Sequence, residues 1–502
     1  MNTMVVLSAT AATELFKNHD LSFANRTITE TMRAHGYDQG SLALAPYGSY
    51  WRVLRRLVTV DMIVTKRINE TTSIRRKCVD DMLQWIEEES CKGGRGAGIH
   101  VSRFVFLMTF NLLGNLLLSR DLLDPESKAG SDFFDAMMGL MEWSGHANLA
   151  DFFPWLRRLD LQGLRKKMER DLGKAMEIAS KFVKERVEDK KVTNDSRKDF
   201  LDVLLEFRGI GKDEPDKLSE RDLNIFILMK EDRVSEDEDN VAGAKSLGSQ
   251  AKKEGRENSI PAEFEIDKGD NDTDEESNDP ACDEIVSDMD YFRSEERMEI
   301  FMAGSETTSS TIEWALTELL CNPESMIRVK AELARVIRAN KKVEESDMEN
   351  LPFLQAVVKE TLRLHPPIPF LVPRRAIQDT DFMGYHIPKN TQVLVNAWAI
   401  GRDPDAWDDP SCFMPERFIG TKVDYRGQNL EFIPFGAGRR ICAGLPLAHR
   451  VLHLILGSLL HHFDWEFEAN VNPASVDRKD RLGITVRKSE PLMAVPVKSN
   501  AV

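Results

Sequence analysis

The segment "PFGAGRRICAGLPLA", residues 434–448, constrains the fold of this chain more than any other. It contains the pattern F-x-x-G-x-R-x-C-x-G, which average residue frequencies would produce by accident in fewer than roughly one chain in 10⁴. The apolar run that follows, "LPLAHRVLHLILGSLL", has the character of a helix and places Cys442 at its start. The loop is therefore a strong candidate for a functional site.

The residue types in this loop suit a flat, anionic metal cofactor. Glycine lets the backbone approach a planar ligand closely, and the fork-shaped guanidinium of Arg440 matches a carboxylate. Backbone N–H groups and the helix dipole favour a thiolate at a helix start, so Cys442 is expected to ionise readily. Haem, a planar iron complex that bears carboxylates, meets these requirements. The alternative is a buried structural cysteine in a tight turn, because free cysteine is commonly buried and inert.

The loop resembles the haem-binding loop of the cytochrome P450 family, in which the cysteine thiolate is the proximal ligand of the iron. The thiolate donates electron density to the iron and favours cleavage of the O–O bond. The resemblance implies haem b as the cofactor, Cys442 as the metal ligand, and Phe435, Gly438, Arg440 and Gly444 as residues that bind the cofactor. It also implies the cytochrome P450 fold, which is mainly α with a small β-region.

Further motifs of the same family follow in the family's order. "KETLRLHP" supplies Glu360 and Arg363 as an E-x-x-R pair, and "FMPERF" supplies Arg417. An E-x-x-R pair alone is uninformative, since about one or two accidental matches are expected in a chain of this length. An exposed helical pair three residues apart is its usual explanation. The order relative to the cysteine loop favours the family interpretation, which gives these three residues a structural role beneath the haem.

Three more residues are expected to bind the haem by resemblance. "YWRVLRRLV" matches the family's W-x-x-x-R and places Trp51 and Arg55 on one helical face, where both would approach a haem propionate. Arg374 in "VPRRA" occupies the position of another arginine that contacts a propionate in relatives. The neighbouring Arg375 competes for that assignment.

The stretch "FMAGSETTSS", residues 301–310, matches the family's oxygen-activating motif A-G-x-[DE]-T-[TS]. Ala303 and Gly304 are expected to contact the haem, with the glycine opening space against it. The hydroxyl of Thr307 can bond to a carbonyl in the preceding turn and loosen the helix. Glu306 beside it supplies an acid, so Glu306 and Thr307 are the predicted catalytic pair for proton delivery.

A helix start is the alternative for this stretch, because Ser310 and Glu313 form an S-x-x-E capping box. Elsewhere, apolar residues recur at helical spacing in residues 171–191 and 311–340. Residues 104–118 are predicted to form a buried core helix, since the run is short for a membrane span and contains asparagine and glycine.

Strands are predicted only at a few places. Residues 1–20 read as a strand followed by a helix, residues 381–400 as a hairpin with "PKN" at its turn, and residues 483–498 as further strands. The chain is therefore expected to be mainly helical with a small sheet.

Nearly all of the net charge of −16 lies in one segment. Residues 231–290 hold 21 Asp/Glu and 6 Lys/Arg, a balance of −15, and their only aromatic residue is Phe264. So polar a segment cannot bury enough apolar surface to offset its ordering entropy. The rest of the chain is near neutral, and no nucleic-acid partner is expected. The predicted organisation is an N-terminal part of the cytochrome P450 domain (1–229), an acidic disordered insertion (230–297), and the oxygen-binding helix, E-x-x-R region and cysteine loop of the same domain (298–502).

The resemblance is closest to plant microsomal members of the geraniol 8-hydroxylase type. It implies a haem-thiolate monooxygenase that inserts one oxygen atom from O2 into a small apolar substrate, such as a monoterpenoid, with electrons from NADPH passed on by NADPH–cytochrome P450 reductase. It also implies the cytosolic face of the endoplasmic reticulum membrane. Such relatives begin with a membrane anchor and a proline-rich hinge, which this chain is expected to lack, so the chain itself could be soluble.

The resemblance also places a pocket and a docking surface. Arg52, Arg55, Arg56 and Arg439 are candidates for a basic face that binds an acidic reductase, although a solvated helix surface explains Arg52 and Arg56 equally well. The candidate pocket residues are mostly apolar: His35, Tyr37, Gln39, Met302, Ala303, Ile368, Phe370, Leu482 and Ile484.

Two other functions stay open from the sequence. One is a haem-binding but inactive protein of this family, whose turnover the insertion and the missing N-terminal part have abolished. The other is an enzyme with a cysteine nucleophile, which needs a histidine base nearby. The histidine closest in sequence to Cys442 is His449.

Overall fold

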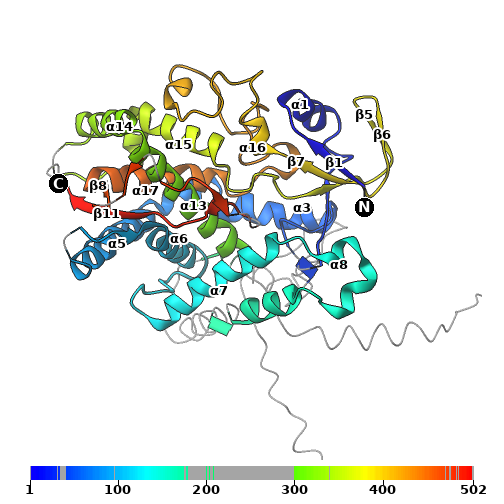
Figure 1. Cartoon of the computed structure of the whole chain (residues 1–502), viewed down its shortest axis with the longest axis horizontal. Helices are drawn as coiled ribbons and strands as arrows, with labels where there is room; N and C mark the ends of the chain where they lie inside the picture. Colours follow the sequence, from blue (N-terminus) through cyan, green and yellow to red (C-terminus); the bar gives the residue numbers. More distant parts are fainter. Residues whose placement is uncertain are drawn as a thin grey trace, which may run out of the picture. The chain divides into compact units, whose positions relative to one another are not determined.

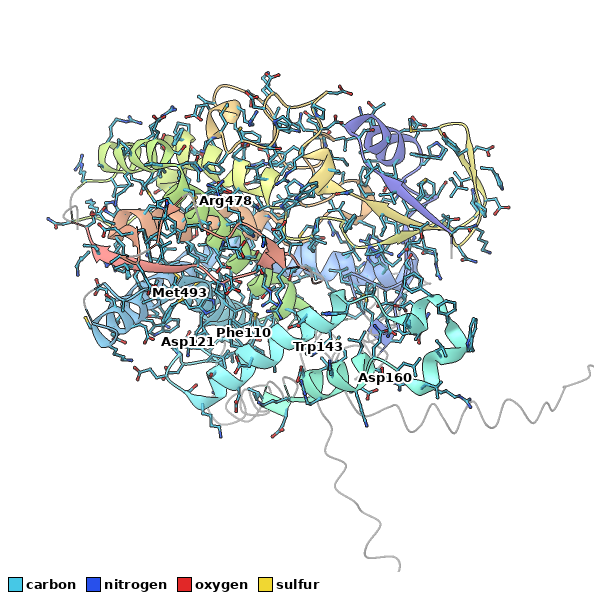
Figure 2. The ribbon with its side chains drawn as sticks, viewed as in Figure 1. Phe110, Asp121, Trp143, Asp160, Arg478 and Met493 are labelled. Carbon is cyan, nitrogen blue, oxygen red and sulfur yellow. The ribbon has the colours of Figure 1, made fainter. Side chains whose placement is uncertain are left out.

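Helix α13 (Glu299–Cys321) crosses the middle of the described fold (Figure 1). It packs on α6 (Val101–Leu118), which is buried almost all round, as its continuous apolar sequence predicts. Phe110 of α6, labelled in Figure 2, lies against Phe301 of α13 with ring centroids 4.6 Å apart. Among the described residues α6 alone is long and apolar enough to cross a membrane, but 78% of it is buried in the protein. The prediction of a core helix is confirmed.

The structure is a computed structural model and describes residues 2–30, 32–33, 41–94, 96–174, 177–178, 199–200, 203, 207, 299–338, 340–469, 471–473, 476–481, 483 and 485–499. Most of the helix predicted for residues 171–191 and the whole acidic segment lie outside them. The other described helices are α1 (Ala9–Asn18), α3 (Ser49–Arg56), η2 (Leu57–Met62), α4 (Thr65–Glu70), α5 (Thr72–Lys92), α7 (Lys128–Gly145), α8 (Leu149–Phe152), η3 (Pro154–Leu159), α14 (Pro323–Val336), η4 (Glu345–Asn350), α15 (Pro352–Leu364), α16 (Ala397–Ile400), η5 (Pro415–Phe418), η6 (Gly438–Arg440) and α17 (Leu445–His462).

The main sheet joins two N-terminal strands, β1 and β2, to two strands from the second half of the chain, β4 and β7. Its strand order is β1-β7-β4-β2, with β1 parallel to β7 and the other pairs antiparallel. A second sheet has the order β3-β11-β8, and β5-β6 and β9-β10 are two-stranded. The strands are β1 (Thr3–Val6), β2 (Asn25–Arg26), β3 (Ile99–His100), β4 (Arg374–Arg375), β5 (Thr380–Phe382), β6 (Tyr385–Ile387), β7 (Gln392–Val395), β8 (Phe463–Phe467), β9 (Asp480–Arg481), β10 (Arg487–Lys488) and β11 (Met493–Lys498).

The buried core consists of two apolar clusters, one among the helices and one at the main sheet. A large apolar cluster surrounds α5, α6, α13, α15 and α17, and a smaller one fills the space between α1 and the main sheet. The chain is thus mainly helical with a small β-region, as predicted, and the strand and helix expected in residues 1–20 are β1 and α1.

Of the local predictions, the position of one turn is wrong. The helical spacing of residues 311–340 is confirmed and belongs to two elements, because α13 ends at Cys321 and α14 begins at Pro323, whose missing N–H suits a first helical position. Helix α13 continues through Ser310, so the capping-box alternative fails. The hairpin turn lies at Met383 and Gly384, which have φ values of +50° and +83°, rather than at "PKN". Strand β7 leaves that hairpin to pair with β1 and β4.

Candidate active site

The cysteine loop is a tight turn that feeds into α17. The main-chain N–H of Cys442 donates to the carbonyl of Phe435 at 3.0 Å, and Gly444 is the residue that precedes the helix. Gly436 and Gly438 have φ values of +72° and +68°, which side chains strongly disfavour. The predicted helix start and the glycine requirement are therefore both present.

Burial raises the pKa of the Cys442 thiol. The N–H groups of Gly444 and Leu445 and the charge of Arg55 act in the opposite direction, but desolvation outweighs them. Protein surrounds the thiol closely enough to desolvate it, although solvent still reaches it. The prediction that the protein alone makes this cysteine ionise readily is therefore wrong.

Helix α3 brings two predicted residues to the loop. Arg55 donates from Nη1 to the carbonyl of Ile441 at 2.5 Å, next to Cys442. The guanidinium of Arg440 lies over the ring of Trp51, 4.3 Å from its centroid. The structure thus gathers Trp51, Arg55, Arg440 and Cys442 in one place.

Strand β4 contributes two arginines beside the cysteine loop, and the side chain of Arg374 is bound to protein groups. Arg374 donates to a carboxylate oxygen of Asp20 at 2.9 Å and to the carbonyl of Ala437 at 3.2 Å. Its guanidinium is thus bound to protein groups. The neighbouring Arg375 has a buried Nε with no hydrogen-bond partner among the described residues. Since buried donors are normally paired, Arg375 is the better candidate of the two for an anionic ligand.

The loop lies in a cluster of buried positive charge. Burial and mutual repulsion lower the pKa values of Arg26 and Arg440, that of Arg440 to about 10. Burial lowers that of Arg374 as well, and Asp20 raises all three. Three buried guanidinium groups beside one carboxylate leave a surplus of positive charge. A planar ligand that carries two carboxylates fits this surplus.

Helix α13 presents a narrow accessible face. Ala303, Gly304 and Thr307 keep solvent access while most of the helix is buried. The hydroxyl of Thr307 donates to the carbonyl of Ala303 at 2.6 Å, as predicted, but the helix stays continuous there. A Cβ at position 304 would lie 2.8 Å from Cδ1 of Leu113. Glycine at this position therefore lets α13 approach α6, which the sequence did not indicate.

Glu306 lies on the buried side of the same helix. Its Oε1 is 3.0 Å from Nε of Arg487 and accepts a hydrogen bond from Thr485 at 3.3 Å. Burial raises the pKa of this carboxyl group, and Arg487 opposes the shift. Glu306 and Thr307 therefore bond to different elements. The other oxygen, Oε2, is buried with no hydrogen-bond partner in the described part of the chain.

The E-x-x-R cluster is confirmed. Arg363 donates through two nitrogens to the two carboxylate oxygens of Glu360, both at 2.7 Å. Arg417 donates to Glu360 at 3.0 Å. Glu360 and Arg363 are fully buried, so this cluster is a structural element of the core.

The structure gives less support to the roles considered for His449 and Arg56. His449 accepts a hydrogen bond from, or donates one to, the hydroxyl of Tyr425 at 2.6 Å, and burial lowers its pKa to about 4. It is therefore a poor base for a cysteine nucleophile.

Of the arginines considered for a docking surface, Arg52 is exposed, whereas the guanidinium of Arg56 lies over the ring of Phe207, 5.9 Å from its centroid.

Of the pocket candidates, Met302 and Ile368 are half-buried, and Ala303 and Phe370 are exposed. His35, Tyr37, Gln39, Leu482 and Ile484 lie outside the described residues. No pattern in the sequence indicated a role for Asp20, since its partners Arg374 and Arg439 lie more than 350 positions away.

The described side chains include no group of three His, Cys, Asp or Glu that could hold a metal ion directly. The sequence model of the cytochrome P450 family matches residues 1–229 and 293–494. This chain belongs to the cytochrome P450 family. It is a monooxygenase of that family, whose members hold haem through a cysteine thiolate.

Curated relatives cover almost the whole chain. Cytochrome P450 76A2 of Solanum melongena is 52% identical over 99% of this cytochrome P450 and 85% of its own length. Iridoid oxidase of Catharanthus roseus is 47% identical over 99% and 84%. Geraniol 8-hydroxylase of the same plant is 35% identical over 99% and 85%. A zebra fish cytochrome P450 solved with abiraterone has a TM-score of 0.69 at 23% identity over 99% and 93%, which establishes the fold.

Proposed function

We propose that this cytochrome P450 inserts one oxygen atom from O2 into a monoterpenoid or iridoid, with electrons from NADPH delivered by NADPH–cytochrome P450 reductase. The observation that carries the proposal is the accessible thiol of Cys442 beside Trp51, Arg55 and Arg440. The names of two relatives, iridoid oxidase and geraniol 8-hydroxylase, support the substrate class.

Each residue of the site has a proposed role. Cys442 ligates the iron, and the haem so held supplies the activation of dioxygen. Trp51, Arg55 and Arg440 hold the propionates, as does Arg375 in preference to Arg374. The remaining cofactor contacts are those of Ala303, Gly304, Phe435, Gly438 and Gly444.

The substrate pocket is proposed to include apolar residues beside the accessible face of α13. Met302 and Ala303 lie on that helix, and Ile368 and Phe370 follow α15. Incubation of the purified enzyme with reductase, NADPH, geraniol and ¹⁸O2 is expected to give a product that contains one ¹⁸O atom. Haem binding without product from any monoterpenoid or iridoid tested would instead favour the inactive alternative.

Thr307 is proposed to direct protons to reduced oxygen. Its hydroxyl lies on the accessible face of α13 and can exchange its bond to Ala303 for one to a ligand. Replacing Thr307 with alanine should leave the haem content unchanged but lower the yield of product per NADPH at least about tenfold, with hydrogen peroxide released instead.

The matched control is Thr317→Ala, which removes the same type of bond, to the carbonyl of Glu313, from a buried position of the same helix. Both variants lose one helical side-chain bond, so only a role at the site predicts uncoupling in Thr307→Ala alone. Equal coupling in Thr307→Ala and the parent enzyme would contradict the role.

We also propose that the enzyme acts at a membrane surface. Large apolar side chains are exposed along α8, η3 and the residues that follow η3. Figure 2 labels Asp160 in this segment. The most exposed of these side chains, Trp155, is 74% exposed. Contiguous exposed apolar side chains of this kind mark membrane or protein contacts. They are Leu149, Phe152, Phe153, Trp155, Leu159 and Leu161.

The double variant Trp155→Ser/Leu159→Ser should reduce sedimentation with phospholipid vesicles at least about tenfold, because each side chain loses its apolar burial. Ile327→Ser, on α14, removes an equally exposed apolar side chain from another element and should have little effect. Equal losses in both would argue against a membrane contact at this segment.

The docking surface for the reductase is proposed to include Arg52, which is exposed on α3 one residue from Trp51. Such encounters are steered by charge and weaken with salt. Reversing this charge in Arg52→Glu should slow the first electron transfer at low salt and leave substrate affinity unchanged. An effect on substrate affinity alone would assign Arg52 to the pocket instead.

Residues 230–297 are proposed to be an insertion that the working fold does not need. Their charge and lack of apolar periodicity support this, as does the match of the family model on either side of residues 230–292. Joining Leu228 directly to Glu299 should raise both the haem occupancy and the melting temperature. Loss of haem on this deletion would show that the segment is a necessary element.

A further inference from the structure

Asp20 joins distant parts of the chain at the cysteine loop. It follows α1, and its side chain is buried. Its Oδ1 accepts a hydrogen bond from Nη1 of Arg374 at 2.9 Å. Its Oδ2 accepts one from the main-chain N–H of Arg439 at 2.9 Å and another from Nη1 of Arg439 at 3.0 Å. One carboxylate therefore holds α1, strand β4 and the loop together.

The loop backbone is shaped around this carboxylate. A Cβ at Gly438 would lie 2.5–2.8 Å from the carboxylate atoms of Asp20, in addition to the strain of its φ value of +68°. The next residue, Arg439, gives its amide to Asp20, and Cys442 follows three residues later. Because the turn is short and internally hydrogen-bonded, fixing the Arg439 amide restricts the direction from which Cys442 projects.

Asp20 is also the counter-charge of the buried arginine cluster. It is the one carboxylate that raises the pKa values of Arg26, Arg374 and Arg440 together, within the described part of the chain. Charge-assisted hydrogen bonds of this kind are short and strong when buried. Removing the charge leaves Arg26 and Arg374 with main-chain carbonyl acceptors alone, while the shape of the site can be kept by asparagine.

We propose that Asp20 is a positioning residue that fixes the cysteine loop on the haem and lowers the reduction potential of the iron. The inference rests on the proposed role of Cys442 as the iron ligand. A buried negative charge beside the loop opposes the addition of an electron to the haem, because protein charges interact strongly where water is excluded. The amide bond to Arg439 holds the ligand in place.

The test compares Asp20→Asn with the parent holoenzyme and with Glu14→Gln. Glu14 is a partly exposed carboxylate on α1, the helix that precedes Asp20, and it pairs with His19, so the control removes an equal charge away from the loop. We expect Asp20→Asn to lose haem to a competing apoprotein about tenfold faster and to have a more positive reduction potential. We expect Glu14→Gln to match the parent in both.

Unchanged potential and unchanged haem loss in Asp20→Asn would overturn the proposal. If the variant does not fold, amide hydrogen exchange of the parent decides the question. The Arg439 amide should exchange as slowly as those of α17, although the Arg439 side chain is 47% exposed, and rapid exchange would refute the bond to Asp20. Failure of the proposed function is distinguishable, because it would remove the thiolate-type spectrum of the parent itself.

Discussion

Replacing Glu360 with alanine should lower the free energy of unfolding by about 3–5 kcal/mol, which is the cost of leaving a buried charge without its partner. The carboxylate accepts two hydrogen bonds from Arg363, one from Arg417 and one from the main-chain N–H of Met414. Without it, the guanidinium of Arg363 remains fully buried beside carbonyl groups alone. This loss is a large fraction of the stability of an ordinary domain.

Urea denaturation followed by circular dichroism measures the effect as a shift of the midpoint. The matched control is Glu416→Ala, which removes a carboxylate from η5, close in sequence to Arg417. Glu416 pairs with Arg328 at the surface, where both side chains are about half exposed, so the control should cost less than about 1 kcal/mol. Similar midpoints for the two variants would contradict a structural role for the E-x-x-R cluster.

The sequence predicted those parts of the site that are local in the chain. Glu360 and Arg363 are three residues apart in one helix, so their contact follows from helical spacing. The bond from Thr307 to Ala303 spans one turn and was likewise predictable.

Contacts between distant segments were not predictable in this way. Gly304 lies close to Leu113 of another helix, and Asp20 finds partners in β4 and the cysteine loop. The misplaced hairpin has the same origin, because β7 pairs with β1 from the opposite end of the chain. Tertiary pairing of this kind overrides local turn preferences.

The protonation of Cys442 depends on burial, which is also a property of the whole fold. A helix start favours a thiolate in any sequence, and the structure contains the expected N–H groups. Their effect is smaller than the cost of desolvation by the surrounding protein. A local motif therefore predicted the position of this cysteine but not the direction of its pKa shift.

Replacing Cys442 with serine should abolish the thiolate-type spectrum and product formation together. Serine keeps the size of the side chain and the loop hydrogen bonds of the main chain, but a hydroxyl does not supply the soft, electron-donating sulfur ligand. The loss of monooxygenase activity should be complete within detection. The matched control is Cys412→Ser, an exposed cysteine whose carbonyl, not its thiol, bonds to Arg363 and Arg417.

The most direct measurement is the carbon monoxide difference spectrum of the dithionite-reduced, purified protein. We expect the thiolate-type absorption band for the parent chain and for Cys412→Ser, and its absence from Cys442→Ser. The same band in Cys442→Ser, or none in a haem-loaded parent chain, would contradict the assignment of Cys442 as the ligand that the haem site is built around.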